Sequence, residues 1–131
     1  MPSIFSKIVS GQIPAYKVAE DDNYLAFLDA FPLQKGHVLV IPKKESDYIF
    51  DLDGDSYSGL MNFSKRVAKA LKKSIKCTRI SMHVIGLEVP HVHVHLVPIH
   101  SMNDCNFANE KIKLSKEEFE HIASGISVNF S

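Results

Sequence analysis

The chain has 131 residues, 45% of them hydrophobic and 23% charged, an ordinary composition for one globular domain spanning residues 1–131. Its 15 Lys and Arg residues balance its 15 Asp and Glu residues, which excludes the overall basic charge that draws a protein to nucleic acid. No stretch has the length and apolarity of a membrane span or a signal peptide, so we expect a cytoplasmic protein with no membrane partner. Cys77 and Cys105 lack metal-type spacing and are expected to be reduced thiols.

Local patterns predict three helices and five strands. In chain order, they are a short helix at residues 4–9, strands at 15–20 and 23–29, a strand at 37–41 that ends at Pro42, a long helix opening at 53–55, strands at 79–86 and 91–97, the last closed by Pro98, and a final helix after the capping box at 115–118. The strands outnumber the helices and occur in adjacent pairs. This order favours an antiparallel sheet in an α+β fold.

Three histidines, His91, His93 and His95, alternate with aliphatic residues near the end of this series. In an extended strand, alternate side chains point to opposite faces, so the three imidazoles are expected to share one face. The aliphatic residues between them are expected to pack on the core, which leaves the imidazole row on an accessible surface. Imidazole titrates near neutral pH and serves as nucleophile, acid, base or metal ligand.

Three interpretations of this row are open. The histidines decorate an exposed strand, or they bind zinc, although the chain has no Cys-x-x-Cys and Glu88 is the only acidic residue near the row. Alternatively, a neutral imidazole attacks phosphorus and forms a labile phosphoramidate that water then cleaves. His93 is the geometric choice for that nucleophile because it alone has an imidazole on each side.

The motif at residues 91–97 resembles the signature of the histidine triad (HIT) superfamily of nucleotide hydrolases and transferases. Other blocks resemble its small nucleotide-binding branch and occur in the same order, at residues 4–9, 13–15, 20–22, 25–29 and 36–44. The resemblance covers roughly residues 3–98, and the segment 99–131 lies outside it. Several separated blocks are more specific than one short motif.

The resemblance implies a HIT-like α+β fold with a five-stranded antiparallel sheet and flanking helices, commonly paired into a homodimer with a joint sheet. It also implies attack on the α-phosphorus of a nucleotide, usually an adenosine one such as an AMP derivative, through a nucleotidyl-histidine intermediate and with no cofactor. We therefore expect a phosphoramidase, hydrolase or nucleotidyl transferase for a purine nucleotide. The alternative is a nucleotide-binding or sensor dimer with little catalytic activity.

Site residues follow from the same resemblance. His93 matches the nucleophile, and His91 and His95 match the flanking catalytic histidines. Asp29 matches the acidic residue that binds the ribose hydroxyls, and His83 lies where relatives place a polar nucleotide contact. The residues that match the apolar walls around the base are Phe5, Ile8, Phe27 and Leu39.

The chain departs from its relatives at three places, one of which is Pro98-Ile99, where some branches have a glycine pair after the triad. Zinc-binding relatives carry Cys-x-x-Cys where this chain has Ser3 and Ser6, while His37 and His91 match their remaining ligands. Because serine hydroxyls are poor zinc ligands, we expect no structural zinc. Before the triad, residues 87–89 replace a Gln-Ser-Val approach with Leu-Glu-Val, so the leaving group is the least determined part of the site.

Overall fold

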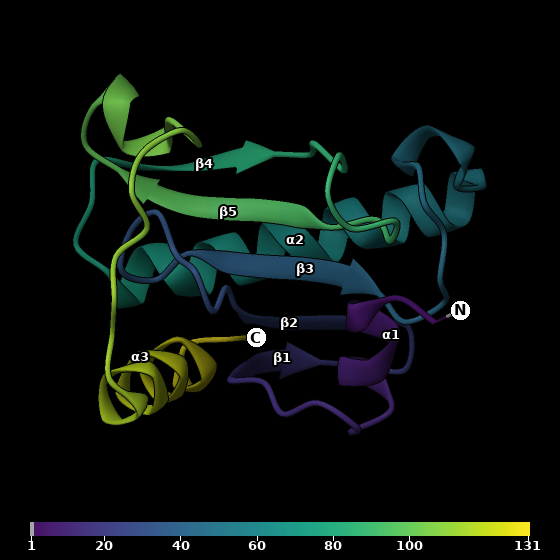
Figure 1. The fold of residues 1–131 in the computed structure, drawn as a ribbon, viewed down its shortest axis with the longest axis horizontal. Helices are drawn as coiled ribbons and strands as arrows, with labels where there is room; N and C mark the ends of the chain where they lie inside the picture. Colours follow the sequence, from purple (N-terminus) through teal and green to yellow (C-terminus); the bar gives the residue numbers. More distant parts are fainter. Residues whose placement is uncertain (1) are drawn as a thin grey trace.

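The computed structural model describes residues 2–131 (Figure 1). Its helices and strands, in chain order, are α1 (Ile4–Val9), β1 (Lys17–Glu20), β2 (Tyr24–Leu28), β3 (Val38–Pro42), the 3-10 helix η1 (Ile49–Asp51), α2 (Gly54–Ser74), β4 (Arg79–His83), β5 (Val94–Ile99), the 3-10 helix η2 (Met102–Cys105) and α3 (Lys116–Val128). The predicted α+β class is confirmed. No helix within the described residues is long and apolar enough to cross a membrane.

The five strands form one antiparallel sheet in the order β1-β2-β3-β5-β4. Its centre is β3, and its two edges are β1 and β4. In Figure 1, α2 lies behind the sheet and α1 lies in front of it. The two faces are therefore covered by different helices.

The main core lies between the sheet and the helices α2 and α3. Leu60, Phe63, Val67 and Leu71 follow helical spacing along α2 and are all buried there. They pack against the aliphatic side chains of β3 and of the histidine motif, where Val92, Val94 and Leu96 are buried in the same cluster. The prediction that these aliphatic residues face the core is confirmed.

Side-chain caps account for where the helices begin. The side chain of Ser3 accepts a hydrogen bond from the Ser6 N–H, and the side chain of Asp53 accepts one from the Ser56 N–H. Ser115 and Glu118 form the predicted capping box at the start of α3.

The histidine strand is shifted relative to its prediction at residues 91–97. The strand β5 starts at Val94, because the backbone N–H of His91 donates to Val89 and that of Val92 donates to Ser46, outside the sheet. It then continues through Pro98, which pairs with Ile80 on β4. Pairing with β3 involves only 94–96, so the missing N–H of proline costs no hydrogen bond on that side.

One further prediction is corrected, since the strand predicted at residues 79–86 ends at His83. The 3-10 helices η1 and η2 are additional elements that the sequence analysis does not predict. Single turns of this kind carry too little periodicity to be recognised in a sequence.

Candidate active site

The three histidines of the motif lie on the α1 face of the sheet, and they are buried rather than exposed. His91 is 0% exposed, His93 7% and His95 8%. The expectation of an accessible row is therefore wrong. Two aromatic rings cover the row, since the Phe5 ring centroid lies 5.0 Å from that of His93 and the Phe107 centroid lies 4.9 Å from that of His95.

A backbone carbonyl determines the protonation of His93. Its Nδ1 lies 2.7 Å from the carbonyl oxygen of His91, which only accepts hydrogen bonds, so Nδ1 carries the proton. The lone pair of the neutral ring is then on Nε2, which is the nitrogen available to attack an electrophile. The nucleophile assigned by the resemblance has the tautomer that nucleophilic attack requires.

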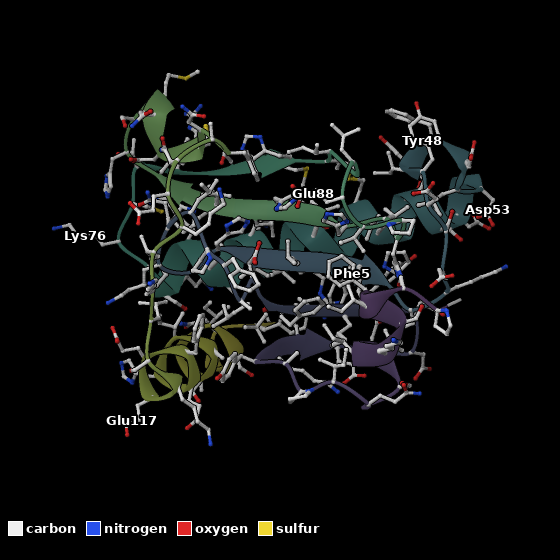
Figure 2. The ribbon with its side chains drawn as sticks, in the orientation of Figure 1. Phe5, Tyr48, Asp53, Lys76, Glu88 and Glu117 are labelled. Carbon is white, nitrogen blue, oxygen red and sulfur yellow. The ribbon has the colours of Figure 1, made fainter. Side chains whose placement is uncertain are left out.

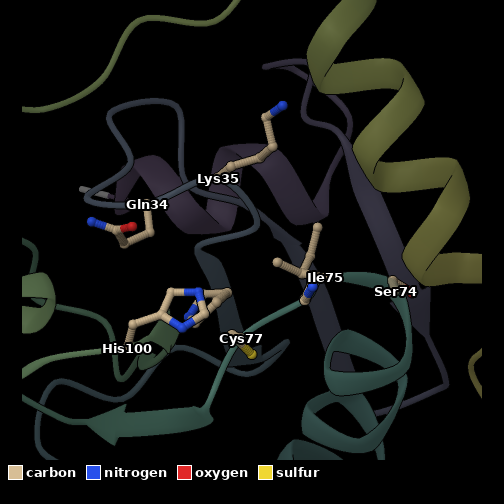
Figure 3. Close-up of a pocket in the computed structure, with 8 residues that line it drawn as sticks. Gln34, Lys35, Ser74, Ile75, Cys77 and His100 are labelled. Carbon is tan, nitrogen blue, oxygen red and sulfur yellow. The ribbon is translucent and has the colours of Figure 1, made fainter.

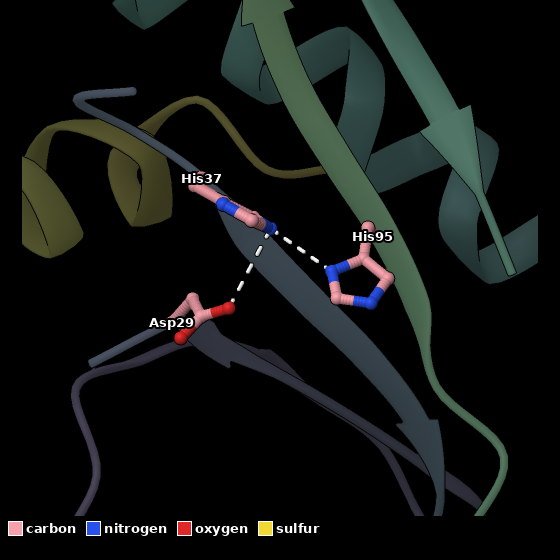
Figure 4. Close-up of side chains that lie close together, drawn as sticks. All are labelled: Asp29, His37 and His95. Atoms are coloured by element: carbon pink, nitrogen blue, oxygen red, sulfur yellow. Dashed lines mark hydrogen bonds and ion pairs between the residues drawn. The ribbon is translucent and has the colours of Figure 1, made fainter. Parts of the chain in front are cut away.

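A relay of hydrogen bonds orients His95 (Figure 4). The Leu33 N–H donates to His37 Nδ1 over 3.0 Å, so the proton of His37 is on Nε2. That Nε2–H donates to His95 Nδ1 over 3.0 Å, which leaves the proton of His95 on its own Nε2. His95 is thus a hydrogen-bond donor beside the His93 ring, whose centroid is 5.0 Å away.

Both relay histidines are held neutral. Burial, with smaller contributions from the neighbouring His93 and His83, lowers the pKa of His95 to about 4. Burial likewise lowers the pKa of His37 to about 3. Neutral rings keep one donor and one acceptor each, which the relay requires.

His91 has a different role, because protein atoms occupy both of its ring nitrogens. Its Nε2–H donates to the carbonyl of Pro42 over 2.8 Å, and its Nδ1 accepts from the Ser3 hydroxyl over 2.8 Å. The ring also contacts Phe5, with centroids 5.8 Å apart. His91 therefore joins α1 to the end of β3 and presents no free nitrogen to a ligand.

The four residues that match the ligands of zinc-binding relatives do not all lie together. Ser3 and Ser6 adjoin His91, but His37 lies at the other end of β3, within the His95 relay. Glu45, rather than His37, is the fourth member of the cluster around His91. Its Oε1 accepts hydrogen bonds from the Ser3 N–H at 2.6 Å and from the Ser6 hydroxyl at 2.7 Å. These hydrogen bonds lower the pKa of Glu45 to about 2. Two hydroxyls and one carboxylate bonded to each other do not fit zinc.

Asp29, His37 and His95 bring three potential metal-ligand atoms within 4.8 Å of one another. The hydrogen bonds of these residues suit the relay that orients His95 better than they suit metal coordination. His37 Nε2 carries a proton because Leu33 donates to its Nδ1, and a protonated nitrogen does not ligate.

Asp29, the expected ribose ligand, follows β2 at the edge of the histidine cluster. Its Oδ1 accepts from the Phe31 N–H over 2.9 Å, and its Oδ2 lies 3.6 Å from His37 Nε2. Burial raises the pKa of Asp29, although the hydrogen bond from the Phe31 N–H opposes this rise. Glu88 is exposed and lies over the sheet on this face (Figure 2).

The four expected base-wall residues share one apolar cluster between α1 and the sheet. Phe5 and Phe27 lie edge to face with centroids 5.7 Å apart, and Leu39 pairs with His95 across the strands β3 and β5. Phe5, Ile8, Phe27 and Leu39 are all buried there, together with Leu25 and Ile41. The structure therefore brings them beside the histidines as one apolar surface.

His83 reaches the same face from the edge strand β4. It is the direct partner of His95 in the β4–β5 pairing. Phe107, to which the sequence assigned no role, packs against both rings, with its centroid 5.2 Å from that of His83. The segment that contains Phe107 follows η2. A hydrogen bond from the Ile112 N–H to the carbonyl of Pro32 holds this segment against the domain. Only the tertiary contact identifies Phe107, because its segment carries no motif.

A cavity of about 300 Å³ lies elsewhere, beside the C-terminal end of α2 (Figure 3). It is lined by Gln34, Lys35, Ser74, Ile75, Cys77 and His100, among others. The triad histidines do not line it. The cavity and the histidine cluster are therefore separate features.

Comparison with known proteins gives consistent results. The profile of the HIT domain matches residues 10–102. An uncharacterised HIT-like protein of Borreliella burgdorferi is 34% identical over 134 residues, covering 96% of each chain. The adenosine 5'-monophosphoramidase hnt1 of Schizosaccharomyces pombe is 38% identical over 99 residues, covering 75% of this chain and 74% of its own.

A solved structure agrees with this result. A HIT-like protein from Bartonella henselae, described as involved in cell-cycle regulation, superimposes with a TM-score of 0.84 at 31% identity. The superposition covers 98% of this chain and 96% of the other. It therefore extends beyond residue 102, where the family profile ends.

Proposed function

This chain belongs to the HIT family, and from that premise we propose that it cleaves a purine nucleotide at the α-phosphate through a nucleotidyl-His93 intermediate. The observation that carries the proposal is the pair of tautomers at its centre. His93 has its lone pair on Nε2, and His95 beside it has a proton on Nε2. A nucleophile and a donor to a phosphoryl oxygen are thereby adjacent.

In the first step, the Nε2 lone pair of His93 forms a bond to the α-phosphorus. The bond from phosphorus to the leaving group breaks, and the leaving group takes up a proton from solvent. His95 Nε2–H donates to the phosphoryl oxygen on which negative charge accumulates. In the second step, water forms a bond to phosphorus and the P–N bond to His93 breaks, which releases the nucleoside monophosphate.

The remaining residues of the cluster suit the nucleoside. The apolar surface of Phe5, Phe27 and their neighbours under α1 would contact a base, which is flat and largely apolar on its faces. Asp29 Oδ2 lies 3.6 Å from His37 Nε2, beside the relay that orients His95, and we assign its carboxylate to the ribose hydroxyls. A carboxylate accepts from two vicinal hydroxyls.

The name of the S. pombe relative supports an adenosine phosphoramidate as the substrate to test first. The protein is incubated with adenosine phosphoramidate, quenched in base and digested, and the mass of the peptide that contains His93 is measured. We expect an AMP adduct on that peptide, and we expect the His93→Ala variant to lose several orders of magnitude in turnover.

Wild-type turnover by His93→Ala would contradict this mechanism. Tight AMP binding in calorimetry without turnover of any nucleotidyl substrate would instead support a nucleotide-binding or sensor protein.

We also propose that the protein acts as a homodimer joined at β4. This strand is an edge of the sheet, and an exposed apolar strip continues from it. The strip comprises Met82, Val84, Ile85 and Leu87. An unpaired apolar edge favours pairing with another strand, and a second copy of β4 would extend the sheet. A monomeric mass in light scattering at micromolar concentration would exclude this arrangement.

A further inference from the structure

We propose that His83 is the general base of the second step, which accepts a proton from the water that attacks nucleotidyl-His93. This inference rests on the proposed function, since it needs the covalent intermediate. It concerns a residue on the edge strand β4, outside the triad motif.

The first observation is the position of His83. It pairs directly with His95 across β4 and β5, and such partners have Cβ atoms about 4.5–5.5 Å apart on the same face. Phe107 packs against both rings, at 5.2 Å from His83 and 4.9 Å from His95 between centroids. His83 thus borders the place where His95 would hold a phosphoryl oxygen.

The second observation is which nitrogen of His83 is free. The Ser81 hydroxyl donates to the carbonyl of Val97 over 3.1 Å, so its oxygen must accept from His83 Nε2, 3.0 Å away. The proton of His83 is therefore on Nε2, and Nδ1 has the lone pair. No group within residues 2–131 donates a hydrogen bond to that Nδ1.

Burial lowers the pKa of His83, so the ring is neutral near pH 7 and its lone pair is available to accept a proton. The ring is only partly buried, which lets water reach it. Both properties suit a base that acts on a water molecule.

The surroundings of His95 indicate from which side that water arrives. Leu39 on β3 flanks His95 on one side, and His83 on β4 flanks it on the other. The apolar surface proposed for the base lies toward β3 and α1. With the nucleoside on that side, His83 on β4 lies on the other side of His95 from the base, which is the side that we assign to the attacking water.

The water oxygen forms a bond to phosphorus while one water proton moves to His83 Nδ1. The bond between phosphorus and His93 Nε2 breaks, and its electron pair returns to Nε2. His83 then loses the acquired proton to solvent, which restores both histidines and leaves the nucleoside monophosphate.

The test separates the two steps in time by rapid quenching with adenosine phosphoramidate. In His83→Gln, the amide nitrogen can still donate to Ser81, but no basic nitrogen remains. We expect release of one leaving group per site at the wild-type rate, followed by steady-state turnover reduced about 10²-fold, since positioned bases contribute at least that much. The AMP adduct on His93 should accumulate.

A second variant distinguishes the loss of a base from misfolding of the first variant. His83→Ala should show the same burst, and added imidazole should restore its steady-state rate without changing the burst. His121→Asn is the matched control, because His121 is an exposed histidine on α3, and its kinetics should equal those of the wild type.

Two results would overturn the proposal. If His83→Gln hydrolyses the adduct at the wild-type rate, or slows burst and steady state equally, His83 is not the base, although His93 remains the nucleophile. If neither wild type nor variant forms an adduct on His93, the proposed function itself fails.

Discussion

At His93 and His95, backbone groups rather than other acids or bases determine where the protons are. The carbonyl of His91 places the proton of His93 on Nδ1, and the Leu33 N–H determines the tautomer of His37 and, through it, that of His95. Backbone groups do not titrate in the physiological range. The arrangement of nucleophile and donor is therefore present before any ligand binds, which is the condition for electrostatic preorganisation.

His37 should act as a positioning residue. In His37→Phe, a ring of similar size fills the buried site, but His95 Nδ1 loses its donor. The proton of His95 would then be shared between its two nitrogens, so its Nε2 would donate to the phosphoryl oxygen only part of the time. We expect kcat to fall about 10- to 100-fold, as for other groups that orient a ligating or donating histidine.

The tautomer itself is measurable through the ¹⁵N chemical shifts of the His95 ring. In the wild type, Nε2 should have the shift of a protonated nitrogen, and in His37→Phe the two shifts should approach each other. His37→Gln, which retains an N–H donor, should recover part of the kcat. Unchanged shifts with an unchanged kcat in His37→Phe would show that the relay does not orient His95.

Among the elements, α1 depends most on its tertiary contacts. A helix of six residues is unstable alone. It is held by the apolar contacts of Phe5 and Ile8 and by hydrogen bonds from its first turn to Glu45 and His91. Since Phe5 covers His93, the same contacts that fold α1 also cover the nucleophile.

The loop before β3 depends on a glycine. Gly36 has a φ of 90°, and a Cβ there would lie 2.9 Å from Ile75 Cγ1 on the chain that leaves α2. We expect Gly36→Ala to lower the free energy of unfolding by about 1–3 kcal/mol, from backbone strain and the steric conflict together. The change in urea midpoint at constant m-value measures it.

Gly125→Ala is the matched control. Gly125 lies within α3, and a Cβ there would meet no atom within 4 Å. Alanine favours the helix over glycine by about 0.5–1 kcal/mol, so this variant should be more stable than the wild type. Equal effects of the two substitutions would mean that the loop conformation at Gly36 is not required.

For the whole molecule, the buried histidines link stability to pH. The pKa of His37 is lowered from its ordinary value of 6.5 to about 3, and that of His95 to about 4, in both cases mainly by burial. The unfolded chain therefore takes up protons at these residues before the folded protein does. Their stabilising contribution is complete above pH 6.5 and decreases as the pH falls toward 4 and then 3.

We expect the free energy of unfolding, measured by urea titration, to be several kcal/mol lower near pH 4 than near pH 7, since one pKa unit corresponds to about 1.4 kcal/mol. The His37→Phe variant should lose less stability over the same interval, because one of the two buried imidazoles is absent. A wild-type stability that is constant over this interval would contradict the burial of the two rings.

Much of the fold was predictable from the sequence because its determinants are local. The caps at Ser3, Asp53 and Ser115 act over three residues, and the apolar spacing of α2 acts over successive turns. The alternation of histidine and aliphatic residues likewise assigned each side chain to a face of the sheet. The central position of His93 in that row made it the candidate nucleophile.

The properties that make the histidines a chemical site were decided by the tertiary structure. His37 and His95 are 58 residues apart, and Ser3 and His91 are 88 residues apart, yet each pair shares a hydrogen bond. Glu45 rather than His37 completes the serine cluster, and Phe107 covers the row from a segment with no motif. Burial and tautomer depend on groups brought together from distant parts of the chain, and local periodicity contains no information about them.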